Sequence, residues 1–359
     1  MEDQIALGVL AVLIGVFVGV LLFVPFVAVS YRRRGGLSFW RFVGWAAALI
    51  YFWAIWTYTL LPLPDPDELQ CRQPNLDLLA FIDDIQRAIA APGSPLTNPL
   101  ILQLVLNVAL FLPLGFFVRV LGGRGVVVAT LIGLGVSLFI ETTQLTGVWG
   151  LYPCAYRVFD VDDLLTNTLG ALLGALVAFA VPKHHRGFAR SPDAGEPDPV
   201  TRGRRFVAML CDYMGAVVLQ VVLAIGVQLL LFAVGEERLM EEGQLAGVLS
   251  SGLTAALWLG IALGTGRTIG DLAVQLRYTG STLPTWLSRT LRWLGGIGGF
   301  LLVGMLPGSW AQLNIVFLLA CAVLLFTTKQ GRGLPGLISG QGLIDARSRE
   351  AVSPGTPAR

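Results

Sequence analysis

Long apolar runs recur along the chain and are separated by shorter polar segments. A helix needs about 20 mostly apolar residues to cross a bilayer, and the runs predict about nine membrane helices. They lie near residues 7–29, 40–61, 99–118, 126–144, 163–181, 206–234, 245–265, 293–306 and 310–328. The eighth run is short and rich in glycine, so it either spans the membrane or forms a tilted or re-entrant segment. The predicted fold class is an all-α, polytopic transmembrane helical bundle.

A polar stretch rich in proline, glycine and charge interrupts the apolar pattern at residues 182–204. Such composition is typical of a linker. It predicts two membrane domains, a five-helix domain at 1–181 and a four-helix domain at 205–330. Residues 331–359 are predicted to be a disordered cytoplasmic tail.

The basic residues predict the orientation of the chain. If the N-terminus lies outside, most of the 25 Lys and Arg residues fall in the inside segments. The outside segments then hold only Arg72, Arg87, Arg157 and Arg238. An excess of basic residues on the cytoplasmic side is the rule for membrane proteins. We therefore expect an external N-terminus and a cytoplasmic C-terminus in a cell membrane.

The composition agrees with a membrane protein and excludes several other classes. The chain is 55% hydrophobic and 13% charged, with a mean hydropathy of +0.71, whereas an average soluble chain is about 25% charged. A net charge of +2 gives no reason to expect a nucleic-acid partner, and membrane lipids are the expected surroundings. Four Cys and two His residues are too few and too scattered for a zinc site, so no metal and no cofactor is expected. Cys211 and Cys321 lie inside predicted helices and are interpreted as inert core residues.

The longest predicted outside loop, residues 62–98, is rich in proline. It contains an amphipathic stretch, Leu76–Ile89, with apolar residues at helical spacing. This stretch is either a packed surface helix or an interfacial helix that lies on the outer leaflet. Cys71 and Cys154 both fall on the outside, where disulfides persist, so the topology allows a bond between them.

Polar side chains gather in the third, fourth and fifth predicted helices and at the entry to the fifth. They are Asn107, Glu141, Gln144, Arg157, Asp160, Asp163 and Asn167. Placing such polar groups inside a bilayer costs free energy, so their presence indicates a structural or functional role. At about 1.5 Å per residue, three of the helices place a polar group at a similar depth in the outer half of the membrane. Gly170 and Gly174 form a pair of small residues that lets another helix approach closely.

Two interpretations of these polar residues remain open. In the first, they form a hydrogen-bonded network that fixes helix packing. In the second, they line an outward-facing pocket for a polar head group or an ion. The second is preferred because the acidic side chains outnumber the cations available there.

The order and spacing of these residues resemble those of the VanZ-like family over residues from about 40 to 181. The matching positions are Asn107, Phe111, Pro113, Leu114 and Gly115, then Glu141 and Gln144, then Arg157, Asp160, Asp163, Asn167 and Gly170. The resemblance implies a cell-envelope setting. The family's namesake is associated with low-level resistance to the glycopeptide teicoplanin, so a role in glycopeptide susceptibility is the corresponding expectation.

The second half carries a different motif. Arg205 and Asp212 are seven residues apart, so two helical turns place them on one face. With Gly266, Thr268, Gly270 and Arg277 they resemble the RDD family of membrane proteins, over about residues 200–330. Many members have lysine at the position of Asp271. The three candidate residues of this motif are Arg205, Asp212 and Asp271. The resemblance implies a membrane domain for which transport has been proposed in some members.

Three functions are compatible with the sequence. The preferred one is a non-enzymatic envelope protein that binds a lipid, a lipid-linked wall precursor or a glycopeptide near the outer leaflet. The alternative is a small-solute or ion transporter with Glu141 and Asp212 as coupling groups. A membrane-embedded hydrolase or transferase using Glu141, Asp160 and Asp163 is the weakest, because no Ser-His or Cys-His arrangement supports nucleophilic catalysis. No catalytic residue is assigned.

Overall fold

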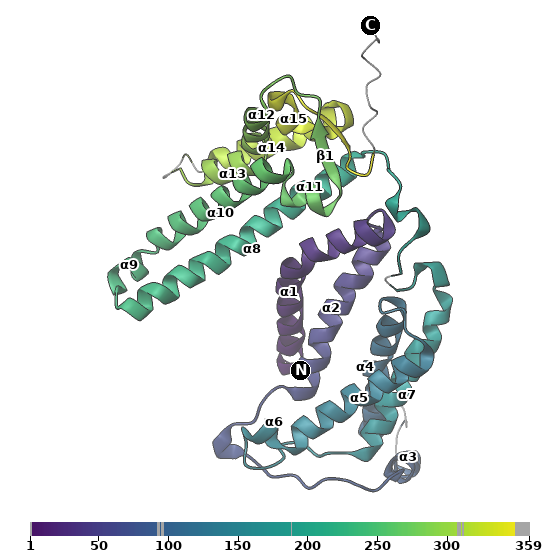
Figure 1. Ribbon diagram of the computed structural model, residues 1–359. Coiled ribbons are helices and arrows are strands. Elements are labelled where there is room, and N and C mark those ends of the chain that lie inside the picture. Colours follow the sequence, from purple (N-terminus) through teal and green to yellow (C-terminus); the bar gives the residue numbers. More distant parts are fainter. Residues whose placement is uncertain are drawn as a thin grey trace. The chain divides into compact units, whose positions relative to one another are not determined.

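The computed structural model describes residues 2–91, 94, 97–187, 189–306, 310 and 312–348. The described chain is mostly helical, with very little strand, and divides into two compact units (Figure 1). Unit 1 holds the chain up to Gly19 and residues 38–189, and unit 2 holds residues 20–37 and the chain from Arg190 onward. Helix α1 (Glu2–Arg34) therefore contributes its first part to unit 1 and its last part to unit 2.

Unit 1 is built around three packed helices. Its elements after α1 are α2 (Phe39–Leu60), η1 (Pro66–Glu68), α3 (Ala80–Ala90), α4 (Pro99–Val120), α5 (Val126–Leu145), α6 (Gly147–Gly150), α7 (Val161–Val177), η3 (Ala178–Ala180) and η4 (Lys183–His185). Helix α7 packs against both α4 and α5, and α4 also contacts α5 and α2. The side chains of Ile55, Phe111 and Ile140 form a buried core between α2, α4 and α5.

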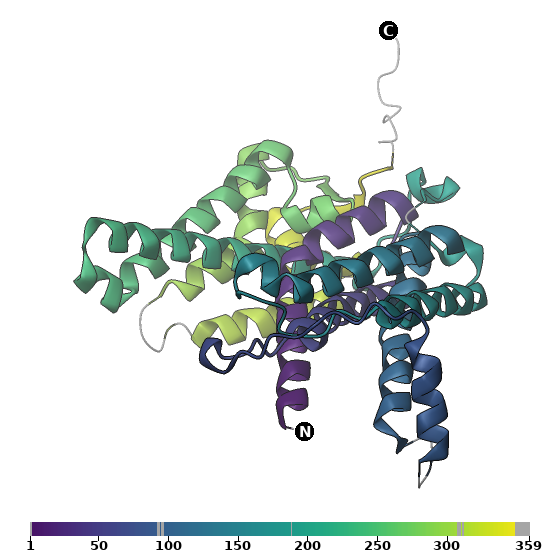
Figure 2. The ribbon, with the colours of Figure 1, turned by 90° about the horizontal axis from the view of Figure 1, so that it is seen from below.

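Unit 2 combines a long helical hairpin with a group of short elements. Its elements after α1 are η5 (Pro192–Gly195), α8 (Arg202–Val234), α9 (Glu237–Glu242), α10 (Gln244–Thr265), α11 (Ile269–Ala273), β1 (Leu276–Thr279), α12 (Thr285–Leu294), α13 (Ile297–Gly304), α14 (Leu313–Thr327), η7 (Lys329–Gly331), α15 (Gly333–Ser339) and β2 (Gly342–Asp345). Helices α8 and α10 lie side by side and are joined through α9 (Figures 1 and 2). Strands β1 and β2 pair antiparallel.

Seven helices of the described chain are long and apolar enough to cross a membrane. They are Ile5–Arg34, Phe39–Leu60, Pro99–Val120, Val126–Leu145, Val161–Ala180, Arg202–Val234 and Gln244–Thr265. Many large apolar side chains on these helices are exposed, which suits a surface in contact with lipid. The predicted all-α, multi-pass membrane fold is confirmed.

The last two predicted spans differ from the prediction of nine long helices. The run at 293–306 is divided between the end of α12 and the eight-residue helix α13, with Gly295 and Gly296 between them. The run at 310–328 forms α14, which has 15 residues and is shorter than the seven helices long enough to cross a membrane. Glycine weakens a helix and permits unusual backbone angles, which explains the break in the eighth run.

The predicted disordered tail also needs correction over its described part. Residues 333–339 form α15, and residues 342–345 form β2, which pairs with β1. Asp345 accepts hydrogen bonds from Arg204 and Arg347. A strand partner more than 60 residues earlier in the chain orders this segment.

Candidate functional site

Close contact between α4 and α7 determines the geometry of the first candidate site. A Cβ atom added at Gly174 would clash with the carbonyl group of Leu112, and one added at Gly170 would clash with that of Val108. Only glycine permits so close an approach of the two backbones. The small-residue pair found in the sequence therefore lies at a real helix contact.

The start of α7 is held by side chains from two other segments. Asp160 is its N-cap residue, and one carboxylate oxygen accepts a hydrogen bond from the amide of Asp162 at 2.9 Å. The other oxygen accepts from Nδ2 of Asn75 at 3.1 Å. Glu141 on α5 is buried, and its Oε2 accepts from the backbone amide of Asp160 at 3.1 Å. Carboxylates are favourable at this position because a helix N-terminus carries partial positive charge.

Asn107 and Asn167 form hydrogen bonds between α7 and its neighbouring helices. Nδ2 of Asn107 on α4 donates to Oδ1 of Asp163 at 2.6 Å. Nδ2 of Asn167 donates to the hydroxyl of Ser137 on α5 at 2.9 Å, whereas the buried Oδ1 of Asn167 has no partner in the described chain. The polar groups on the three helices thus gather around α7, although each bonds to a different partner.

Two of the predicted cluster residues are directed to the end of α2. Nε2 of Gln144 donates to the carbonyl oxygen of Thr59 at 2.7 Å. Arg157 donates to the same carbonyl at 3.0 Å and to that of Leu61 at 2.9 Å. The last carbonyl groups of a helix lack partners within the helix, so these two side chains cap α2.

The segment after Cys71 is tied to the entry of α7. Cys71 and Cys154 form a disulfide with a Cα–Cα distance of 5.5 Å, the bond that the predicted topology allowed. Both carboxylate oxygens of Asp162 accept backbone amides, from Leu79 and Phe81, each at 2.8 Å. Asp162 thereby fixes the start of α3, the helix formed by the predicted amphipathic stretch. Asp162 lies between the motif positions Asp160 and Asp163, and only the fold reveals its role.

Acceptors outnumber donors in this cluster. Glu141, Asp160 and Asp163 all place their carboxyl groups at the first turn of α7, where each accepts at least one hydrogen bond. None of the three forms an ion pair with a Lys or Arg within the described chain. Among the described residues, no group of three or more His, Cys, Asp or Glu side chains is arranged to hold a metal ion. The arrangement can accept hydrogen bonds from a donor-bearing or cationic group.

The three residues of the second motif lie together in unit 2. Nη1 of Arg205 donates to Oδ1 of Asp271 at 2.8 Å, and both side chains are buried. Asp212 accepts from Nε1 of Trp258 at 3.1 Å, from the amide of Gly270 at 2.8 Å and from the hydroxyl of Thr268 at 2.6 Å. The sequence does not show that Trp258 and Thr268 donate to Asp212, because these contacts depend on the packing of α8 with α10 and α11.

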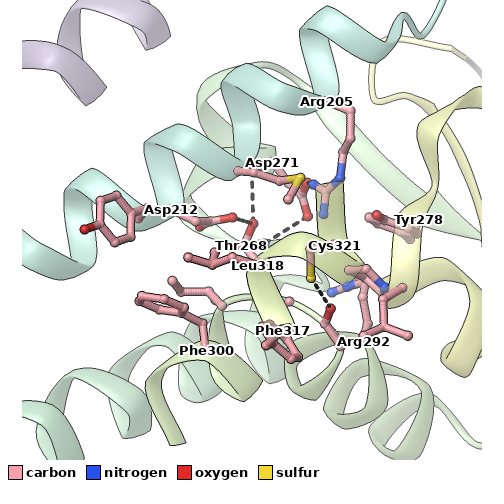
Figure 3. A pocket seen from close by; sticks show the side chains of 18 residues that line it. Arg205, Asp212, Thr268, Asp271, Tyr278, Arg292, Phe300, Phe317, Leu318 and Cys321 are labelled. Atoms are coloured by element: carbon pink, nitrogen blue, oxygen red, sulfur yellow. Dashed lines mark hydrogen bonds and ion pairs between the residues drawn. The ribbon is translucent and has the colours of Figure 1, made fainter. Parts of the chain in front are cut away.

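A cavity of about 100 Å³ lies next to this cluster (Figure 3). Its lining includes Arg205, Asp212 and Asp271, together with Arg292 on α12 and Cys321 on α14. The sequence gives no sign that Arg292 is buried beside a cavity, and it places Cys321 in an inert core. Both residues reach the cavity only because short elements far apart in the chain pack together.

Comparison with known proteins gives one family match, over part of the chain. No curated protein and no solved structure matches the chain. The family model described as VanZ/LLP1 matches residues 48–182. This segment contains the later part of α2, all of α4, α5 and α7, and all seven candidate residues of the first site. This part of unit 1 is therefore similar to the VanZ/LLP1 family.

Proposed function

We propose that the protein acts in the cell envelope and that its VanZ-like part binds a polar, donor-bearing group at the cluster around the start of α7. The ligand would be a lipid head group, a lipid-linked wall precursor or a glycopeptide, and binding would change susceptibility to glycopeptides of the teicoplanin type. One observation carries the proposal. The carboxyl groups of Glu141, Asp160 and Asp163 all lie at the first turn of α7, without a cationic partner in the described chain.

Two features support an external position for this cluster. The disulfide between Cys71 and Cys154 lies in the segments that flank it, and disulfides persist in oxidising compartments. The distribution of basic residues assigns the same side to the outside. Helix α3 exposes Ile82 and Ile89, which suits a helix at the membrane interface, close to lipid head groups.

The proposal is tested by expressing the protein in a teicoplanin-susceptible bacterium. We expect the wild-type protein to raise the minimal inhibitory concentration of teicoplanin. Glu141→Gln and Asp163→Asn should return it toward that of the empty vector, because a lost charged hydrogen bond weakens binding by about tenfold or more.

The matched control is Glu68→Gln, which neutralises an exposed carboxylate in the loop that carries Cys71. Membrane levels of all variants are compared by immunoblot. If wild type and variants give the same inhibitory concentration at equal membrane levels, this function is excluded.

The alternative function is transport through unit 2. The geometry of unit 2 supports transport less well. Both carboxylate oxygens of Asp212 are occupied, by three donors in total, so the group is well placed to fix α11 against α8. A transporter would instead show proton- or sodium-coupled flux in proteoliposomes. Loss of that flux in Asp212→Asn would replace the present proposal.

A further inference from the structure

Arg292 is a buried cation with unused hydrogen-bond donors. Its side chain lies on α12 and is 2% exposed. Within the described chain, Nε and Nη2 have no hydrogen-bond partner, and Nη1 reaches only Oε1 of Gln341, at 3.4 Å. A buried guanidinium without partners is strongly unfavourable. An anion or ordered water in the adjoining cavity would remove that penalty.

The nearby carboxylates are already bonded to other groups. Asp271 accepts from Arg205 at 2.8 Å and from the amide of Thr268 at 3.3 Å. Asp212 accepts from three neutral donors and lies well apart from Arg292 in Figure 3. Arg292 forms no ion pair with a described residue. Arg292 is therefore a cation on the cavity wall that has no carboxylate bonded to it in the described chain.

The rest of the cavity wall is mixed. The guanidinium groups of Arg205 and Arg292 lie over the ring of Tyr278, 5.4 and 5.1 Å from its centroid. The backbone at Gly295 and Gly296, just before α13, forms another part of the lining. At about 30 Å³ per water, the volume of about 100 Å³ accommodates three waters or one phosphate or carboxylate group.

The apolar part of the lining includes a side chain that is also exposed on the surface of the protein. Phe300, Phe317 and Leu318 line the cavity beside the charged residues. Leu318 belongs to the apolar helix α14 and is 47% exposed. A free, fully hydrated ion would gain nothing from these side chains, whereas an alkyl chain would bury apolar surface against them.

We propose that this cavity binds the oxyanion head of an amphiphile, a phosphate or carboxylate attached to an apolar chain, with Arg292 as its principal donor. A guanidinium pairs with both groups through two parallel hydrogen bonds. The apolar chain lies against Phe300, Phe317 and Leu318. The site is in unit 2 and is independent of the function proposed for unit 1.

Binding is measured on the purified full-length protein in a neutral detergent. The probes are dodecyl phosphate, dodecanoate, inorganic phosphate and dodecanol. We expect both charged amphiphiles to bind at least tenfold more tightly than inorganic phosphate, and dodecanol not to bind measurably. Mass spectrometry of the purified protein identifies whether a phospholipid or a fatty acid is the natural source.

Two matched variants test the role of the charge. Arg292→Gln should weaken binding of the charged amphiphiles about 10- to 100-fold, since a hydrogen bond to a charged group is lost. Arg289→Gln removes the same charge one turn earlier on α12, where Arg289 is not part of the cavity lining and donates to the carbonyl of Leu263. Arg289→Gln should bind like the wild type.

If Arg292→Gln does not fold, a second pair of variants tests whether the cavity binds an oxyanion. Cys321 lies on the cavity wall, with Sγ 3.9 Å from the carbonyl oxygen of Gly295. Cys321→Asp supplies an internal carboxylate and should abolish binding while the protein stays monodisperse, whereas Cys321→Ser should retain it. The proposal is overturned if charged amphiphiles bind no tighter than inorganic phosphate or dodecanol. It is also overturned if Cys321→Asp binds like Cys321→Ser.

Discussion

The contact between α4 and α7 makes a sharp prediction for one glycine. A Cβ atom at Gly174 would lie 2.7 Å from the carbonyl carbon of Leu112, 3.0 Å from the amide nitrogen of Phe116, and closer still to the Leu112 oxygen. Ordinary van der Waals contact begins at 3.4 Å. Because the opposing atoms are backbone, no side chain can rotate out of the way. Gly174→Ala therefore requires α4 and α7 to separate locally by more than the 0.7 Å that the contact with the carbonyl carbon alone demands.

Two effects of opposite sign determine the size of the change. Adding a methyl group to a packed contact costs about 1–3 kcal/mol, and backbone-to-backbone clashes belong at the upper end of that range. Replacing glycine by alanine inside a helix recovers about 1 kcal/mol. We expect Gly174→Ala to lower the free energy of unfolding by about 2 kcal/mol.

The assay is reversible unfolding of the purified protein in mixed micelles of mild detergent and dodecyl sulfate. The matched control is Gly135→Ala on α5, where an added Cβ meets nothing within 4 Å. This variant should be as stable as the wild type, or more stable by up to about 1 kcal/mol. If Gly174→Ala and Gly135→Ala shift the unfolding midpoint in the same direction, the close approach of α4 and α7 is refuted.

Two further predictions concern carboxylates that hold short elements in place. Asp345→Asn leaves Arg204 buried without its ion pair, which costs about 3 kcal/mol, so hydrogen exchange in β2 should accelerate at pH 7. Burial alone would raise the pKa of Asp345, but hydrogen bonds from Arg347, Arg204 and backbone amides outweigh it and hold the pKa below its usual 3.8. Its contribution to stability should therefore persist as the pH falls from 7 to 4 and be lost only in stronger acid; loss of protection between pH 6 and 4 would contradict this. Asp162→Asn weakens two hydrogen bonds at the start of α3, so amide exchange in residues 79–81 should rise about tenfold or more, while exchange in α5 stays unchanged.

The membrane helices could be predicted because their cause is local. A run of about 20 apolar residues has few alternatives to a helix in lipid, and the predicted run at 99–118 corresponds closely to α4. The contact through Gly170 and Gly174 was predictable for the same reason, since the spacing of small residues on one helix is visible in the sequence.

The partners of polar side chains could not be predicted in this way. The sequence places Gln144 and Arg157 with the other cluster residues, but it does not show that the end of α2 lies within their reach. The order of the segment after residue 331 depends on β1, and the cavity beside Arg292 depends on elements from α8 to α15. These features arise from contacts between distant parts of the chain, which hydrophobic periodicity does not encode.

The two candidate sites have opposite chemical needs. Around the start of α7, Glu141, Asp160 and Asp163 leave acceptors in excess, so a ligand there must bring donors or positive charge. In unit 2, Arg292 leaves donors in excess, so a ligand there must bring an oxyanion. Each site would therefore reject the simplest ligand of the other, because like charges brought together in a partly desolvated site repel strongly. Loss of teicoplanin response in Glu141→Gln and loss of amphiphile binding in Arg292→Gln are consequently separate outcomes. Either can occur without the other, and a variant that abolished both would indicate damage to the whole fold and not to a site.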